Sequence, residues 1–298
     1  MVYTEISSNK QKTFLLITFF LILIIGLGWI FSYTNDAPIL LPIAVIFSTL
    51  MSLGSYYYSD KIVLAMSGAR EIKKIDDPEL YNIVENLSIT AGLPTPKIYS
   101  INDTAPNAFA TGRDPKHAVV AITTGLRIKL SKQELEGVMA HELSHIGNYD
   151  IRLQTIVVVL VGIITLLADW MFRMSFARRR GNSEGNGIIL LLGVVFALLA
   201  PIGATLIQLA ISRKREYLAD ASSALLTRYP QGLASALQKI SNDHEPLEVA
   251  NKATAHMYIV NPLNEHKGGK DKVGWFAGLF NTHPPIQERI KKLNSMSF

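Results

Sequence analysis

Long uncharged apolar segments constrain this chain more than any other feature of its sequence. No charged residue occurs from Thr13 to Asn35 or from Ala37 to Ser59, and each run is about 23 residues long. As a helix, a run of this length crosses roughly 30 Å of hydrocarbon. The first run is too long for the apolar region of a signal peptide, and no small-residue cleavage site follows it. The two runs predict a membrane hairpin that turns at Asp36 and Pro38.

Two further apolar runs lie in the second half of the chain. Leu153–Ala168 is about 16 residues long, and Gly185–Ser212 is about 28 residues long and contains Pro201 and Gly203. Because the third run is short for a membrane span, two alternatives remain open. Besides crossing the membrane, the third run can be a buried core helix, or it can dip into the membrane with the fourth run as a re-entrant hairpin. With either hairpin the chain returns to the side it left, so residues near 141 and near 216 share one compartment.

Basic residues at the ends of the runs predict the orientation. Lys10 and Lys12 precede the first run, Lys61 follows the second, and the turn at 32–38 has no Lys or Arg. Short cytoplasmic loops carry the excess of Lys and Arg, so the N-terminus and residues 61–152 are expected in the cytoplasm. If all four runs cross the membrane, the four arginines between the third and fourth runs lie outside, against the expected excess of basic residues in the cytoplasm. A re-entrant hairpin would keep these arginines on the cytoplasmic side.

Composition narrows the class of protein. The chain is 49% hydrophobic and 18% charged, more apolar than a typical soluble domain, and carries a formal charge of +5. Many of its basic residues flank the apolar runs and do not alternate with aromatic residues, so we interpret the charge as facing phospholipid and expect no nucleic-acid partner. With no cysteine, a metal site must use histidine and carboxylate ligands.

The segment between the two predicted hairpins contains a metal-binding pattern. Ser131 followed by Glu134 predicts a capped helix over 132–146, with Gly147 as its left-handed stop. His141 and His145 are four residues apart, so both imidazoles project from one helix face and can bind a single Zn²⁺. Glu142 would reach a water on that metal and act as the base. The alternative is a surface helix with two solvated histidines.

A third ligand is expected directly after the fourth apolar run. Glu216 and Asp220 again lie one helical turn apart, and two histidines with a glutamate form a recurring catalytic zinc site. We predict that Glu216 is the third ligand and that Asp220 accepts the spare ring N–H of a zinc-bound histidine. Alternatively, both acids pair with Arg213 and Arg215 on a solvated face.

Three motifs together resemble the HtpX family of membrane metallopeptidases (peptidase family M48). They are His141-Glu142-Leu143-Ser144-His145 with Asn148 and Asp150, Arg215-Glu216-Tyr217-x-Ala219-Asp220, and Thr282-His283-Pro284-Pro285. The resemblance covers nearly the whole chain. It implies a zinc endopeptidase of the bacterial cytoplasmic (inner) membrane that degrades damaged or misfolded membrane proteins in stress, with His141, His145 and Glu216 as ligands and Glu142 as base.

Two further parts of the site are predicted from local sequence. Asn107, Ala108 and Phe109 precede a β-rich run at 118–124, and an edge strand there could pair with an extended substrate, although an ordinary strand and turn explain the same residues. His283, held by two prolines, is our candidate for stabilising the oxyanion, with Tyr217 as the second choice. A surface turn is the alternative for His283.

The sequence therefore predicts a mainly α-helical integral membrane protein with two transmembrane hairpins and a cytoplasmic zincin-like α+β domain. The predicted segments are a hairpin at 1–59, protease parts at 60–152 and 213–298, and a second hairpin at 153–212, with one zinc ion per chain. Expected partners are membrane-protein or unfolded substrates, the phospholipid bilayer and, as an open alternative, a second copy or quality-control proteins. Rival functions are a CAAX-type processing protease and a zinc-containing scaffold that does not cleave. A gate at the Lys-rich 265–274 loop or the edge strand is also predicted.

Overall fold

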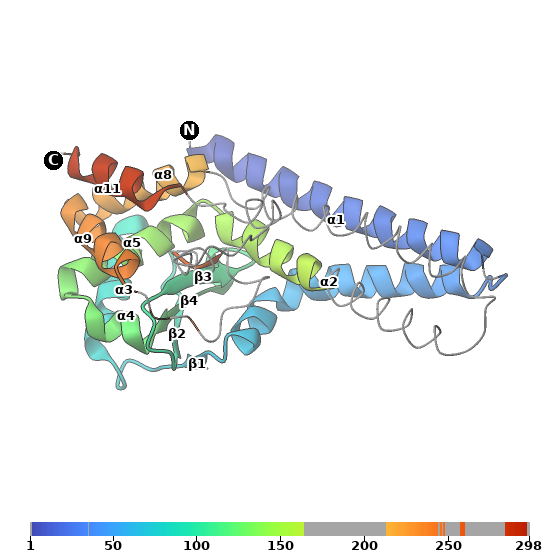
Figure 1. The fold of residues 1–298 in the computed structure, drawn as a ribbon, viewed down its shortest axis with the longest axis horizontal. Helices are drawn as coiled ribbons and strands as arrows, with labels where there is room; N and C mark the ends of the chain where they lie inside the picture. The colour runs from blue at the N-terminus through green and yellow to red at the C-terminus, as the bar shows by residue number, and fades with distance from the viewer. Residues whose placement is uncertain are drawn as a thin grey trace, which may run out of the picture.

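Two long helices project side by side from a domain built around a four-stranded sheet (Figure 1). The computed structural model describes residues 2–34, 36–163, 213–243, 245, 247, 257–259 and 284–296. Helix α1 is Val2–Thr34 and helix α2 is Leu40–Met66. Ile6–Ile30 and Leu40–Met66 are long and apolar enough to cross a membrane, which confirms the expectation of two apolar helices at the N-terminus.

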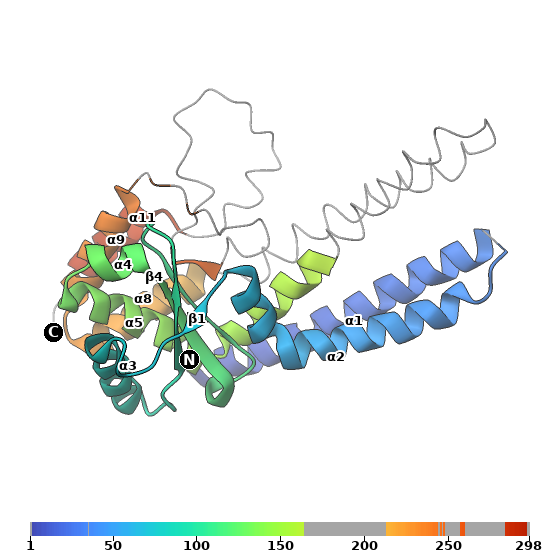
Figure 2. The same ribbon diagram turned by 90° about the horizontal axis from the view of Figure 1, so that it is seen from below.

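Helices α1 and α2 lie side by side along their length (Figure 2). A Cβ added to Gly28 would lie 2.2 Å from Cβ of Ala44, so the helices approach closely at this point. On α2, four buried serines recur every three or four residues and form one face: Ser48, Ser52, Ser55 and Ser59. Such small-residue faces allow close backbone packing where no water is available to drive association.

The sheet has the order β1-β2-β4-β3, so β3 lies at one edge. Its strands are β1 (Arg70–Glu71), β2 (Lys97–Ile101), β3 (Ala108–Gly112) and β4 (Ala118–Thr123), with a 3-10 helix at Pro115–His117 before β4. Strands β2 and β4 are parallel, whereas β1–β2 and β3–β4 are antiparallel.

Both faces of the sheet are covered, which explains why β4 is apolar at nearly every position. Val120 and Ile122 pack into the core formed with helices α3 (Pro78–Ala91) and α5 (Lys132–Gly147). Val119 and Ala121 face the other way, into a cluster that includes Val63 at the end of α2. The sheet thus joins the membrane-length helices to the helices of the α/β domain.

Helix α5 is central to the domain and is fixed by its cap and by close helix crossings. Its first turn is preceded by α4 (Thr124–Lys129), and the backbone N–H of Ser131 donates to Oε2 of Glu134 at 2.8 Å. A Cβ on Gly137 would lie 2.6 Å from the backbone nitrogen of Leu233, so α5 and α9 (Pro230–Ser241) cross at backbone contact. Helices α8 (Arg213–Thr227) and α11 (Ile286–Asn294) complete the layer.

The C-terminal end of α5 differs from the sequence prediction. Gly147 is still helical, and Tyr149 has the left-handed backbone, with φ of 60°. The aromatic ring of Tyr149 lies under Lys10 and Arg152, at 4.8 and 5.1 Å from the ring centroid, contacts that help offset an unfavourable backbone conformation. After this residue, helix Asp150–Ile163 leaves at 82° to α5. The remainder of the third apolar run, the fourth run and the 265–274 loop lie outside the described residues.

Candidate metal and catalytic site

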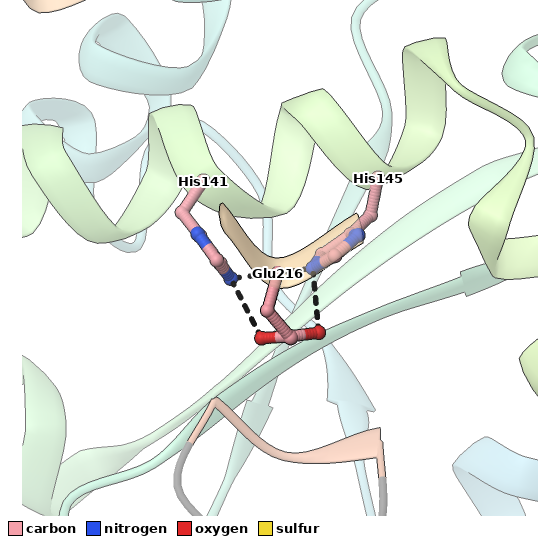
Figure 3. A group of neighbouring side chains, drawn as sticks. All are labelled: His141, His145 and Glu216. Carbon is pink, nitrogen blue, oxygen red and sulfur yellow. Dashed lines mark hydrogen bonds and ion pairs between the residues drawn. The ribbon is translucent and has the colours of Figure 1, made fainter. Parts of the chain in front are cut away.

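Helix α5 brings two histidines together over one point (Figure 3). Nε2 of His141 and Nε2 of His145 are 3.2 Å apart, and the ring planes are at 90° to each other. The two side chains are buried, with relative exposures of 1% and 5%. The alternative of two solvated histidines on a surface helix is therefore wrong.

Helix α8 places Glu216 opposite the histidine pair. Its Oε2 lies 3.7 Å from Nε2 of His141, and its Oε1 lies 3.6 Å from Nε2 of His145. One ligand atom from each of these three residues lies within 4.8 Å of the others. A tetrahedral zinc ion at ~2.0–2.2 Å from each ligand requires separations of roughly 3.3–3.6 Å, so the donor set fits one ion with little adjustment. Glu216 is 2% exposed, which excludes a solvated face.

Each histidine turns its second ring nitrogen toward a buried carboxylate. Nδ1 of His141 lies 3.1 Å from Oδ1 of Asp220, and Nδ1 of His145 lies 3.0 Å from Oδ2 of Asp150. Because an ionised carboxylate only accepts, the ring proton belongs on Nδ1 and the Nε2 lone pair faces the shared point. Asp150 carried no assigned role in the sequence analysis, because it lies beyond the end of the metal helix.

The buried charges of the site favour a cation. Four buried carboxylates surround it, those of Glu142, Asp150, Glu216 and Asp220, and two buried guanidiniums partly balance them, those of Arg215 and Arg289. Among the described residues, the carboxylates at this site outnumber the guanidiniums. Burial by itself lowers the pKa of His145, but the carboxylates of Asp150 and Glu216 outweigh burial and raise that pKa to about 9.

Arg289 of α11 is a site residue that the sequence analysis missed. Its Nη2 and Nε donate to Asp220 at 2.7 and 2.9 Å, and its Nη1 lies 3.6 Å from Oε2 of Glu216. Burial by itself raises the pKa of Asp220, but Arg289 and His141 outweigh burial and lower that pKa to about 2. The sequence pattern could have indicated that Arg289 is buried, because it lies one turn before Leu293, on the apolar side of an amphipathic helix.

Glu142 lies between the histidines in sequence and is 2% exposed. The backbone N–H of Ala110 on the edge strand β3 faces this carboxylate and favours its ionised form. Burial, with a smaller contribution from the nearby Glu216 carboxylate, raises the pKa of Glu142 to about 7. A carboxyl with a pKa near neutrality can both accept and return a proton under ordinary conditions.

The predicted substrate strand coincides with β3 in part. Ala108 and Phe109 begin this edge strand, and Asn107 is buried immediately before it. The Ala108 carbonyl oxygen accepts from the backbone N–H of Ile259 at 3.0 Å, and Phe109 contacts Tyr258 edge-to-face at 5.2 Å between ring centroids. A short segment at 257–259 therefore lies against the start of the edge strand.

Of the two residues predicted to stabilise the oxyanion, the structure describes only Tyr217. His283 lies outside the described residues. The Tyr217 hydroxyl donates to Oε2 of Glu288 at 2.8 Å, in an exposed contact on the surface of the domain.

A His-Glu-x-x-His helix, a glutamate from a distant helix and an adjacent edge strand define a metallopeptidase, here joined to two membrane-length helices. Residues 74–297 match the sequence model of peptidase family M48. The protease HtpX homolog of Dictyoglomus thermophilum is 48% identical over 295 residues, covering 99% of this chain and 94% of that protein. That of Tropheryma whipplei (strain Twist) is 47% identical over 303 residues and covers 99% of both. This chain belongs to peptidase family M48 and is an HtpX-type membrane metalloprotease.

A solved structure supports the fold. The crystal structure of Ste24p from S. mikatae aligns with 98% of this chain and 67% of that chain, with a TM-score of 0.50 and 20% sequence identity. At that identity the likeness concerns the fold alone. The family is zinc-dependent, and the His141, His145 and Glu216 cluster is a set of residues that can hold the ion.

Proposed function

We propose that His141, His145 and Glu216 hold one Zn²⁺ and that Glu142 is the general base for peptide-bond hydrolysis. The observation that carries this proposal is the convergence of three ligand atoms within 4.8 Å of one another. When bound, zinc polarises the scissile carbonyl and lowers the pKa of water to ~7. Glu142 then accepts a proton from the attacking water and returns it to the leaving amine nitrogen.

The other buried residues position these groups. Asp220 and Asp150 hold the two imidazoles with Nε2 toward the ligand point. Arg289 neutralises part of the carboxylate charge and fixes Asp220 through two hydrogen bonds. These contacts keep the ligands in one arrangement before substrate arrives, which lowers the reorganisation needed during reaction.

We further propose that an extended peptide pairs with the outer edge of β3, the edge that faces away from β4. The backbone N–H of Ala110, two residues beyond Ala108, already faces the Glu142 carboxylate, so a strand on this edge passes next to the base. A peptide that pairs at Ala108 replaces Ile259 as the donor to its carbonyl oxygen. Asn107 and Phe109 flank this position.

The proposed location is a bacterial cytoplasmic membrane, with α1 and α2 as a transmembrane hairpin and the active site on the cytoplasmic side. Basic and aromatic side chains support this arrangement. Arg113 lies 5.5 Å from the ring centroid of Tyr57 and Arg152 lies 5.8 Å from that of Tyr56, near the domain end of α2. Aromatic and basic residues gather at membrane–water interfaces in this way. Residues 60–152 and 213–298 would form the protease domain, and 153–212 a second hairpin.

The proposed substrates are damaged or misfolded membrane proteins, because the site lies beside the membrane-length helices. The test uses the full chain in detergent with zinc and, in parallel, after metal removal by a chelator. Three substrates are compared: a membrane protein in its unfolded form, the same protein folded, and a prenylated C-terminal peptide. Zinc-dependent cleavage of the unfolded protein supports the proposal. Cleavage of the prenylated peptide alone favours a processing protease, and zinc binding without any cleavage favours a scaffold.

A further inference from the structure

Asn9 is a buried polar residue on α1 whose side chain reaches into the protease domain. It is 1% exposed. Its Nδ2 donates to the backbone carbonyl of Asn148 at 3.0 Å and to Oδ1 of Asp150 at 2.8 Å, and its Oδ1 accepts from Nη1 of Arg215 at 2.8 Å. A carboxamide has two donors and one acceptor group, and all are used by residues more than a hundred positions away.

These contacts continue to the metal ligands. Asp150 is fully buried and receives Asn9 on Oδ1, while its Oδ2 lies 3.0 Å from Nδ1 of His145. Arg215, the second partner of Asn9, lies 3.5 Å from the same Asp150 oxygen and immediately precedes Glu216. Two segments that carry proposed zinc ligands, the end of α5 and the start of α8, are therefore bridged by one amide from the first membrane-length helix.

We propose that Asn9 is a positioning residue for the metal site, acting through Asp150 on His145. The inference rests on the proposed ligand role of His145. Without the amide donor, Oδ1 of Asp150 is left with the longer contact to Arg215, and the carboxylate loses the hydrogen bond that fixes its rotation. Because the Asp150 carboxylate orients the imidazole of His145, loss of Asn9 misaligns this ring and weakens zinc binding.

The test measures zinc affinity of the full chain in detergent by competition with a chelator. Removing a group that holds a metal ligand in place weakens metal affinity by about 10–100-fold, which is the range expected for Asp150→Asn. Asn9→Ala acts one step further out, and we expect a loss near the lower limit, about 10-fold. The visible absorption spectrum of the Co²⁺-loaded protein is recorded in parallel, because it reports ligand geometry without any turnover, and both variants should change it.

Two further variants separate positioning from packing. Thr13→Ala is the matched control, since Thr13 is buried one turn away on α1 and its hydroxyl donates only to the backbone carbonyl of Asn9 in the described contacts. Its zinc affinity should remain within about twofold of wild type. Asn9→Val removes both hydrogen-bonding groups, is closer in volume to asparagine than alanine is, and is apolar enough for a membrane helix, so it replaces Asn9→Ala if that variant does not fold.

The decisive comparison is the double variant Asn9→Ala with Asp150→Asn. If Asn9 acts through Asp150, the two effects do not add, and the double variant binds zinc as well as Asp150→Asn alone. Fully additive losses, or wild-type affinity in the Asn9 variants, overturn the inference while leaving the proposed function intact. A wild-type protein that binds no zinc overturns both.

Discussion

Both proposed histidine ligands are held by aspartates, and these aspartates are in turn held by arginines. Asp220 is paired with Arg289, and Asp150 lies beside Arg215. The ligands themselves were predictable from spacing, because residues four apart share a helix face. The arginines were not predictable, because each meets its carboxylate only through tertiary packing, across 69 positions in the case of Arg289 and Asp220.

Substitution of Arg289 tests whether its guanidinium balances the buried charge of Asp220. Arg289→Met removes the partner of buried Asp220 and leaves an uncompensated carboxylate, so we expect a loss of about 3–5 kcal/mol in the free energy of unfolding. Lys291→Met on the exposed side of the same helix is the control and should stay within about 0.5 kcal/mol. Chemical denaturation in detergent measures both. Equal stability of the two variants would show that Arg289 does not carry this charge balance.

At the scale of elements, the helix that carries the histidines was predicted well at its start and less well at its end. The Ser131 and Glu134 capping pair marked the N-terminus, and the structure contains the hydrogen bond between them. Gly147 was a reasonable left-handed stop by residue type, but Tyr149 takes that conformation. Local propensity could not place it, because the turn is set by packing of Tyr149 against Lys10 of α1 and by the position of Asp150.

The close crossing of α5 and α9 at Gly137 can be tested by substitution with alanine. In an open helix, Gly→Ala is stabilising by about 0.8–1 kcal/mol. At Gly137 the added Cβ would meet the Leu233 backbone nitrogen at 2.6 Å, and backbone cannot move aside cheaply. We therefore expect Gly137→Ala to lower the unfolding free energy by about 1–3 kcal/mol.

The same helix offers the control. A Cβ on Gly147 would have its nearest neighbour at 3.6 Å, an ordinary contact with Leu93, so Gly147→Ala should be neutral or stabilising. Thermal unfolding of the two variants side by side gives the comparison. If Gly137→Ala is as stable as Gly147→Ala, then α5 and α9 do not cross at backbone contact.

At the scale of the whole molecule, the proposed metal site is close to the base of the membrane-length helices. Asn9 on α1 reaches Asp150, and Val63 on α2 packs beneath the sheet. The apolar runs predicted these helices from length alone, because about 20 apolar residues are needed to cross a membrane. Their attachment to the protease domain depends on contacts between residues far apart in sequence, which no local pattern reveals.

The orientation of the hairpin can be measured because the chain has no cysteine. Pro38→Cys lies in the turn between α1 and α2, and Lys116→Cys lies on the exposed surface of the protease domain. With intact cells and a maleimide that does not cross membranes, Pro38→Cys should be labelled and Lys116→Cys should not. Both should react after the membrane is permeabilised. The reverse pattern would place the active site outside the cytoplasm.

Glu142→Gln in the full chain tests most directly whether Glu142 is the base of a zinc site built by His141, His145 and Glu216. Bound zinc and cleavage of an unfolded membrane protein are measured on the same samples. We expect one zinc per chain in both proteins and a cleavage rate about 10²–10⁴-fold lower in the variant, the usual contribution of a general base. A variant that cleaves at the wild-type rate, or a zinc-loaded wild type that cleaves nothing, would contradict the account.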